Sequence, residues 1–362
     1  MSLIKQGVNF FLFSLGKTKP LTGPIRVHWD ITELCNSRCR HCTRWKVKDS
    51  KEDLSYEECI KFIDELKEVG TLAISFAGNE PLMRKDIYKI IQYADKKGLS
   101  LSLNSNGLLM NEKNCEMLVN SGIGSFIFSL DSCYKEKHDS MRGVKGAFDR
   151  ILEAVIILKK IKEKTGKDIT IQATIVVNKE NINDLEKTVK LCKEKGFDKI
   201  VLQPIHNIPK YFESETELMP VKKDFEKMNE QLEIIIKKYP DFIAVPKEYL
   251  RKFETFFENP SALYKYRCEA GFITCDIRAN GDVVPCPVGF VKMGNLKKNS
   301  FKKIWFSGES DKIRKNIKDN KHPMCWFACI QPINLMAHNI KHFKVRSILD
   351  KEFIKHAFSK LK

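Results

Sequence analysis

Three cysteines stand close together in the segment "CNSRCRHC", residues 35–42. Cys35, Cys39 and Cys42 are separated by three and then two residues, directly after an apolar run typical of a strand. Thiolates are soft ligands that suit zinc or an iron–sulfur cluster. A closed zinc site needs four ligands, whereas a 4Fe–4S cluster held by three cysteines leaves one iron without a protein ligand. That iron can bind a small molecule, so the absence of a fourth cysteine would itself serve the function of the site.

Five further cysteines gather in the last hundred residues of the chain: Cys268, Cys275, Cys286, Cys325 and Cys329. The sequence has no apolar run of about 18 residues and no small-residue cleavage site after its N-terminal apolar stretch. We therefore expect a cytoplasmic protein, in which clustered cysteines are metal ligands or catalytic groups more often than disulfides. The other four of the 12 cysteines are scattered: Cys59, Cys115 and Cys192 on apolar helix faces, and Cys133 in an expected loop.

Strand and helix patterns alternate between residues 25 and 205. Strands are expected at 25–31, 71–76, 99–104, 124–130, 169–177 and 199–205, and helices at 55–70, 85–97, 111–121, 145–163 and 181–195. Six consecutive βα units predict a parallel sheet with right-handed crossovers. Because a closed TIM barrel has eight such units, we expect an α/β fold built on a partial (β/α)6 TIM-like barrel.

The sequence changes character near residue 266. Residues 206–266 are largely helical, with the clearest amphipathic helix at 220–239. "CEAGFITCDIRANGDVVPC" (268–286) then alternates apolar and polar residues around "NGD", which predicts a hairpin. We divide the chain into five parts. They are an N-terminal apolar and basic segment (1–24), the barrel (25–205), a helical linker (206–266), a small C-terminal α+β iron–sulfur domain (267–335) and a basic tail (336–362).

Four unusual segments follow the first four expected strands: the cysteine loop, "AGNEP" (77–81), "SNG" (105–107) and "DS" (131–132). Parallel α/β folds bind their ligands at the carboxyl ends of the strands. We therefore expect these segments to converge on one rim of the barrel.

The segment "CNSRCRHC" matches the pattern CxxxCxxC, and in position, order and strand context the chain resembles the radical SAM superfamily. The resemblance implies a 4Fe–4S cluster on Cys35, Cys39 and Cys42 whose open iron chelates S-adenosylmethionine (SAM). Reductive cleavage of SAM would give a 5′-deoxyadenosyl radical that abstracts hydrogen from the substrate. An electron donor such as flavodoxin or ferredoxin would be a partner.

The same resemblance assigns the SAM site to the converging loops. "AGNEPL" is similar to the family's GGEP motif, with Glu80 facing the amino group of SAM and Gly78 and Asn79 presenting backbone groups. His41, before the last cysteine, would lie against adenine. The other implied contacts are Ser105, Asn106, Ser129 and Asp131 at the nucleoside and Arg142 at the carboxylate. The alternative is that these residues have no role in binding. In that case the "GNEP" loop would be only a turn, and Asp131 would be only a helix cap.

The C-terminal cysteines resemble those of SPASM and Twitch domains. The matching positions are Cys268, Gly281, Cys286, Cys325 and Cys329, together with "GNLKKNSFKKIW" (294–305). The resemblance implies one auxiliary 4Fe–4S cluster with four cysteine ligands, and Cys275 is a spare that could replace one of them. A structural zinc site is the alternative.

Together these patterns predict a radical SAM oxidoreductase acting on a peptide or small molecule, with the auxiliary cluster accepting an electron or anchoring the substrate. A non-catalytic electron carrier is disfavoured, because carriers saturate their clusters with four cysteines. The net charge of +17 comes from dispersed lysines. No nucleic-acid-binding motif accompanies them, so we do not expect a nucleic-acid partner.

The N-terminal segment has eight apolar residues close to Lys5 and to the pair Lys17 and Lys19: Leu3, Ile4, Val8, Phe10, Phe11, Leu12, Phe13 and Leu15. Such a segment suits either packing on the barrel or an interfacial helix on anionic lipid. The basic tail, with Lys341, Lys344, Arg346, Lys351 and Lys355, would add electrostatic attraction. An alternative function is therefore action on a lipid or sugar by a protein held peripherally at the inner membrane surface.

Overall fold

The computed structural model describes residues 3–47, 49–208 and 213–341. All six expected strands form: β1 (Arg26–Asp30), β2 (Ala73–Ala77), β3 (Ser100–Ser105), β4 (Ser125–Ser129), β5 (Thr170–Val177) and β6 (Lys199–Pro204). Each strand pairs in parallel with the next one along the chain. The prediction of a parallel α/β sheet is confirmed.

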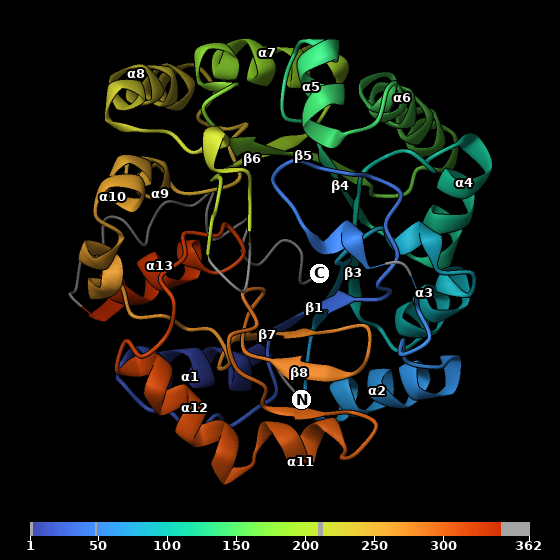
Figure 1. Cartoon of the computed structure of the whole chain (residues 1–362). Coiled ribbons are helices and arrows are strands. Elements are labelled where there is room, and N and C mark those ends of the chain that lie inside the picture. The colour runs from blue at the N-terminus through green and yellow to red at the C-terminus, as the bar shows by residue number, and fades with distance from the viewer. Residues whose placement is uncertain (1–2, 48, 209–212, 342–362) are drawn as a thin grey trace.

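Helices surround the strands on the outside (Figure 1). The expected helices are α2 (Tyr56–Glu68), α3 (Ile87–Lys96), α4 (Glu112–Ser121), α6 (Ala147–Thr165), α7 (Leu185–Lys195) and α8 (Lys222–Lys238). The short helices α9 (Lys247–Leu250) and α10 (Phe253–Glu258) lie in the segment that was expected to be largely helical, whereas the sequence did not predict α5 (Lys135–Arg142). Helix α5 escapes detection because Met141 is the only apolar residue in its sequence, "KEKHDSMR".

Helix α2 illustrates how the local sequence sets these boundaries. Ser55 Oγ accepts a hydrogen bond from Glu58 N at 3.2 Å, and Glu58 Oε2 accepts one from Ser55 N at 2.8 Å, which is a capping box. Gly70 follows the helix with a φ of 85°, a conformation that favours glycine. One face of the helix is buried, and the Phe62 ring lies 4.9 Å from that of Trp29 in β1.

The C-terminal part continues the same sheet. Strand β7 (Thr274–Ile277) pairs in parallel with β1, so that Arg26 lies opposite Thr274. Strands β8 (Asp282–Val284) and β9 (Gly294–Asn295) follow in antiparallel order, which confirms the hairpin predicted around "NGD". The complete sheet has the order β6-β5-β4-β3-β2-β1-β7-β8-β9. It therefore runs without interruption past the change in sequence character near residue 266.

The remaining helices lie beside β7 and β8 (Figure 1). They are α1 (Leu3–Ser14), α11 (Phe301–Trp305), α12 (Gly308–Lys318) and α13 (Gln331–Lys341). From residue 342 onward the predicted basic tail lies outside the described residues. Within the described ranges, no helix is long and apolar enough to cross a membrane.

Helix α1 packs on the barrel with one side and exposes the other. Phe13 is buried, with its ring centroid 3.6 Å from that of Phe272. Gln6 Nε2 donates a hydrogen bond to the Gly70 carbonyl at 2.7 Å. The opposite side exposes Ile4, Val8, Phe11 and Leu15. These four residues recur at helical spacing and form one apolar stripe, which we call the α1 stripe.

Candidate active site

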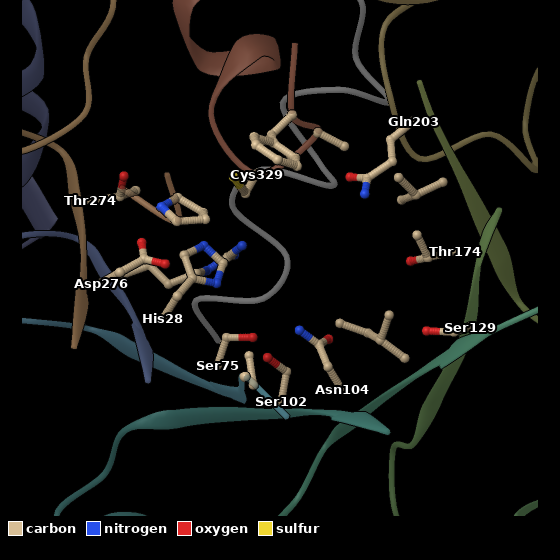
Figure 2. Close-up of a pocket in the computed structure, with 18 of the residues that line it drawn as sticks. His28, Ser75, Ser102, Asn104, Ser129, Thr174, Gln203, Thr274, Asp276 and Cys329 are labelled. Carbon is tan, nitrogen blue, oxygen red and sulfur yellow. The ribbon is translucent and has the colours of Figure 1, made fainter. Parts of the chain in front are cut away.

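A cavity of about 650 Å³ lies inside the barrel. Inward-facing strand residues form its wall (Figure 2): His28, Ser75, Ser102, Asn104, Ser129, Thr174, Gln203, Thr274 and Asp276. All three thiols of the cysteine loop line this cavity, and so does Cys329 from the C-terminal part of the chain. Both cysteine groups therefore border one space that is large enough for a small-molecule ligand.

The cysteine loop follows β1, and its three thiols are partly exposed to the cavity. Cys42 N donates a hydrogen bond to the Cys39 carbonyl at 3.2 Å, and Trp45 Nε1 donates to the same oxygen at 3.3 Å. Burial raises the pKa of Cys35 to about 11 and also raises the pKa of Cys39. Because metal ligation requires the thiolate form, three such thiols at one edge of a cavity fit a strongly cationic group such as an iron–sulfur cluster.

Arg142 places a cation beside this loop. Its Nη1 lies 3.8 Å from Cys39 Sγ, and its Nη2 lies 2.7 Å from Asp131 Oδ2. Burial would raise the pKa of Asp131, but the charges of Arg142 and two nearby histidines hold it below its ordinary value. Asp131 is buried outside the cavity wall, whereas Arg142 lines it. Asp131 therefore acts on the site by positioning Arg142.

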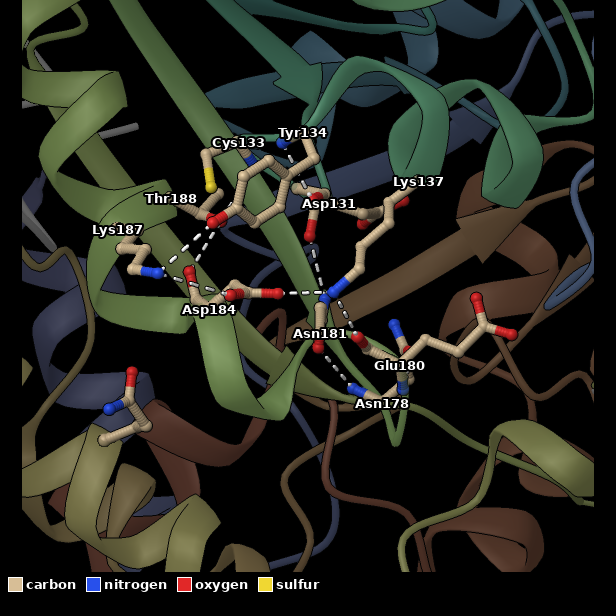
Figure 3. A network of polar contacts seen from close by, with 12 residues as sticks. Asp131, Cys133, Tyr134, Lys137, Asn178, Glu180, Asn181, Asp184, Lys187 and Thr188 are labelled. Atoms are coloured by element: carbon tan, nitrogen blue, oxygen red, sulfur yellow. Dashed lines mark hydrogen bonds and ion pairs between the residues drawn. The ribbon is translucent and has the colours of Figure 1, made fainter.

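A polar network fixes Asp131 between the loops after β4 and β5 (Figure 3). Val176 N donates to Asp131 Oδ1 at 3.0 Å, and Asn181 Nδ2 donates to the Asp131 carbonyl at 2.9 Å. Nearer the surface, Lys137 and Asp184 form an ion pair. These bonds hold the Asp131 carboxylate in place. Asp131, which was predicted to contact the nucleoside, is thus a fixed support for Arg142.

Asp30, the last residue of β1, binds two arginines. Arg44 from the short 3₁₀ helix η1 (Arg44–Lys46) pairs with its carboxylate, and Arg278 Nη1 lies 2.7 Å from Asp30 Oδ2. Burial would raise the pKa of Asp30, but the two guanidinium groups lower it. The two ion pairs tie the cysteine loop and the β7–β8 hairpin to the end of β1.

The "AGNEP" loop places Gly78 and Asn79 in the cavity wall. Gly78 has a φ of 95°, and a Cβ there would come within 2.8 Å of Asp30, so the position requires glycine. Glu80 has no exposed surface and lies behind the wall. Its carboxylate accepts hydrogen bonds from Ser105 Oγ at 3.0 Å and Asn106 N at 2.8 Å. Burial raises the pKa of Glu80 to about 7.

The predicted SAM contacts thus fall into two groups. The cavity wall contains His41, Gly78, Asn79, Ser105, Asn106, Ser129 and Arg142. Glu80 and Asp131 are buried behind them and hold them in place. Burial and, secondly, the charge of Arg142 lower the pKa of His41 to about 4, so its ring is neutral near pH 7 and suited to stacking.

Four of the five C-terminal cysteines form one group, which we call the auxiliary set: Cys268, Cys286, Cys325 and Cys329. Burial raises the pKa of each, and another thiol of the set raises it further. Cys275 instead interacts with Asp276 and Arg314. In β7 it alternates with Thr274 and Asp276, which face the cavity, so it points to the other side of the sheet.

The chemistry of these thiols bears on the kind of metal site. Across residues 3–47, 49–208 and 213–341, no three His, Cys, Asp or Glu side chains are grouped closely enough to hold a single metal ion. Four cysteine thiols are the ligands of structural zinc sites and also of 4Fe–4S clusters, so the auxiliary set has the ligand types that such a cluster needs.

The segment that contains Cys325 and Cys329 is fixed to the end of β6. The His206 and Phe327 rings stack with centroids 3.7 Å apart, and Trp326 N donates to His206 Nε2 at 2.9 Å. This contact brings Cys329 to the cavity wall (Figure 2).

The motifs in the sequence did not include several ionisable residues that line the cavity, among them Arg26, His28, Asp30 and Asp276. Each of these four occupies an alternating position in β1 or β7. Strands of a parallel sheet are normally apolar on both faces. Polar residues at every second position of "RVHWD" (26–30) were therefore a usable signal for an inward-facing site.

A parallel barrel with a three-thiol loop at the edge of a ligand-sized cavity, and a second thiol group beside it, defines an iron–sulfur enzyme. Comparison with known proteins gives the family. The radical SAM superfamily matches residues 29–192, and the SPASM iron–sulfur cluster-binding domain matches residues 268–330. The chain belongs to the radical SAM superfamily and carries a SPASM domain. Its cofactors are accordingly a 4Fe–4S cluster, SAM and auxiliary iron–sulfur.

Two relatives and one solved structure illustrate the similarity. The chain is 28% identical over 298 residues to an AdoMet-dependent heme synthase from Methanosarcina barkeri, covering 79% of this chain and 83% of the relative. It is 26% identical over 305 residues to the mycofactocin maturase MftC of Mycolicibacterium smegmatis, covering 80% and 72%. The structure of anSMEcpe with bound AdoMet and Cp18Cys peptide superposes with a TM-score of 0.62 at 18% identity, covering 93% and 98%.

Proposed function

We propose that this protein is a radical SAM oxidoreductase that removes hydrogen from a peptide or small-molecule substrate held inside the barrel. Cys35, Cys39 and Cys42 would hold the SAM-binding cluster, and the auxiliary set would hold a second 4Fe–4S cluster. When bound, these groups supply the electron that cleaves SAM and a site that accepts an electron from the substrate.

The shared cavity carries this proposal. One space of about 650 Å³ is lined both by the three-thiol loop and by Cys329. A substrate bound there would lie between the two metal groups, where hydrogen removal and electron transfer can act on one molecule. An electron carrier has no need of such a cavity, so the geometry favours an enzyme.

The chain's own residues would bind and orient SAM. Arg142, beside Cys39, offers a guanidinium to the SAM carboxylate. Gly78 and Asn79 offer backbone groups to its ammonium. Glu80 holds Ser105 and Asn106 at the wall through two hydrogen bonds, and these residues would meet the nucleoside.

The test is SAM cleavage by anaerobically reconstituted protein with reduced flavodoxin or ferredoxin as the electron donor. The wild type should release 5′-deoxyadenosine, and Cys35→Ala should release none. Cys329→Ala should still cleave SAM but should no longer complete substrate oxidation. Intact clusters without any SAM cleavage would make the protein an electron carrier.

The relatives suggest two substrate classes to compare. One relative is named a heme synthase, and the structure of anSMEcpe contains a peptide. An iron porphyrin with free carboxylates and the Cp18Cys peptide therefore serve as first probes. The class that accelerates 5′-deoxyadenosine release is the better candidate for this chain.

A second candidate, action on a lipid-linked substrate at an anionic membrane, is favoured by helix α1. Its exposed stripe contains Ile4, which is 75% exposed, and Phe11, which is 53% exposed. Lys5, Lys17 and Lys19 flank this stripe, and apolar side chains between cations suit an anionic bilayer surface. The other side of α1 reaches the cavity through Gln6, Gly7 and Phe10, so the helix would lie between membrane and cavity.

Sedimentation with vesicles of anionic and of neutral phospholipid tests this candidate. The wild type should pellet with anionic vesicles at low salt and be released at high salt. Phe11→Asp should stay in the supernatant without loss of clusters. If the wild type itself does not pellet at low salt, the membrane contact and the lipid-linked substrate are both excluded.

A further inference from the structure

The wall of the cavity is polar where barrels are normally filled by branched apolar side chains. Ser75, Ser102, Asn104, Thr174 and Gln203 all point into the space (Figure 2). Asn104 Oδ1 and Asp276 Oδ1 have no hydrogen-bond partner in the described part of the chain. Buried polar groups are costly unless something hydrogen-bonds to them. The cavity is therefore built to receive a polar molecule.

Three arginines line this cavity, and two of them are neutralised. Arg44 pairs with Asp30, and Arg142 pairs with Asp131 at 2.7 Å. Arg26 takes part in no ion pair and no side-chain hydrogen bond among residues 3–47, 49–208 and 213–341. Among the residues that the structure describes, no acidic side chain neutralises the charge of Arg26 at the cavity wall.

The position of Arg26 in β1 explains why its side chain enters the cavity. Val27 and Trp29 are fully buried on the helix-covered face of the sheet. Successive side chains of a strand point to opposite faces, so Arg26 and His28 point inward. Strand β1 pairs with β7 at this point, with Arg26 opposite Thr274. The guanidinium group therefore lies at the side of the cavity that the C-terminal part of the chain forms, where Thr274 and Cys329 also line the wall.

We propose that Arg26 binds a carboxylate of the substrate inside the barrel. The inference rests on the proposed function and names its substrate class as carboxylate-bearing. A guanidinium group binds a carboxylate through two parallel hydrogen bonds. Among the described residues no lysine lines the cavity, so a single guanidinium matches the single charge of a carboxylate better than the double charge of a phosphate. The carboxylate would be held beside Cys329, with the rest of the substrate extending toward the three-thiol loop.

The experiment measures binding of trifluoroacetate by ¹⁹F NMR to reconstituted protein saturated with SAM. Trifluoroacetamide, which has the same shape without the charge, is the neutral probe. Compared with the wild type, Arg26→Gln should weaken trifluoroacetate binding about tenfold, and Arg26→Lys should weaken it less. Trifluoroacetamide binding should be the same in all variants. Arg150→Gln is the matched control, because Arg150 is exposed and paired with Glu153, and it should change nothing.

Equal trifluoroacetate binding by the wild type and Arg26→Gln overturns the proposal. The alternative role of Arg26 is to offset the charge of Cys329 alone. In that case Arg26→Gln would shift the reduction potential of the auxiliary cluster and leave trifluoroacetate binding unchanged, which also overturns it. Arg26→Lys keeps the charge and serves if Arg26→Gln does not fold. Failure of the proposed function is seen separately, as a wild type that binds trifluoroacetate through Arg26 but never cleaves SAM.

Discussion

Glu80 is a carboxylic acid without exposed surface, and its pKa is raised to about 7 by burial. Because the folded pKa lies above the ordinary value of 4.5, the proton is held more tightly in the folded chain. Its contribution to stability is complete below the ordinary pKa and is lost as the pH rises through about 7. The ionised form accepts stronger hydrogen bonds from Ser105 and Asn106 and would place a negative charge behind the part of the wall that receives the SAM ammonium. We therefore expect SAM affinity to rise with pH through neutrality.

Glu80→Gln tests this carboxylate. The variant should keep both clusters but bind SAM more weakly, because a neutral amide replaces the carboxylate that holds Ser105 and Asn106 at the cavity wall, and hydrogen bonds to a charged group are worth roughly 1.5–3 kcal/mol. The pH dependence of SAM affinity near neutrality should disappear. Titration of SAM against wild type, Glu80→Gln and the surface control Glu153→Gln measures both effects. Unchanged affinity in Glu80→Gln would reduce the "AGNEP" loop to a plain turn.

Asp30→Asn removes the charge that neutralises both Arg44 and Arg278. Two partly buried guanidinium groups would then repel each other without a counter-ion. We expect a loss of about 2–4 kcal/mol, somewhat below that for a fully buried pair because both arginines are partly exposed. The midpoint of thermal unfolding under anaerobic conditions should fall by several degrees, with loss of iron from the three-thiol loop. Asp64→Asn, which breaks an exposed pair with Lys97, should have almost no effect; equal shifts would contradict the anchoring role of Asp30.

At the scale of elements, periodicity was enough to predict β1 to β6 and their covering helices. Each of these strands pairs with its neighbour along the chain, so short-range patterns determine the order. The pairing of β7 with β1 could not be read in this way. A four-residue strand, "TCDI", carries too little signal to name a partner far away in the sequence. Likewise, the motifs predicted the cysteine loop, but only the fold could show that Glu80 and Asp131 stand behind the wall.

Helix α1 allows the two sides of one element to be compared. Phe13 is buried against Phe272, whereas Phe11 is 53% exposed. Phe13→Ala should destabilise the protein by about 3–5 kcal/mol through loss of burial and a residual cavity. Phe11→Ala should change stability by less than about 0.5 kcal/mol. Thermal unfolding of the two variants decides the point, and a similar loss for both would mean that the α1 stripe is covered.

For the whole molecule, the two thiol groups set the metal content. Two 4Fe–4S clusters require about eight iron and eight sulfide per chain after anaerobic reconstitution. Replacing Cys35, Cys39 and Cys42 together with alanine should halve this content and abolish SAM cleavage. Cys275→Ala should retain all of it, because Cys275 interacts with Asp276 and Arg314 and with no thiol of the auxiliary set. Iron and sulfide assays measure the content, and zinc without labile sulfide in the wild type would contradict the assignment of both clusters.

The pairing of β1 with β7 has a consequence for how the chain is made. Asp30 and its partner Arg278 are 248 residues apart. The side of β1 that pairs with β7 therefore remains an open edge of the growing sheet until β7 has been synthesised. Edge strands of this kind invite pairing with other chains. A chain shortened before residue 267 would carry that edge permanently, next to the three thiols of the cysteine loop. We expect it to aggregate rather than to fold into a smaller radical SAM enzyme, and light scattering during refolding, with and without the separate piece from residue 267 onward, would measure the difference.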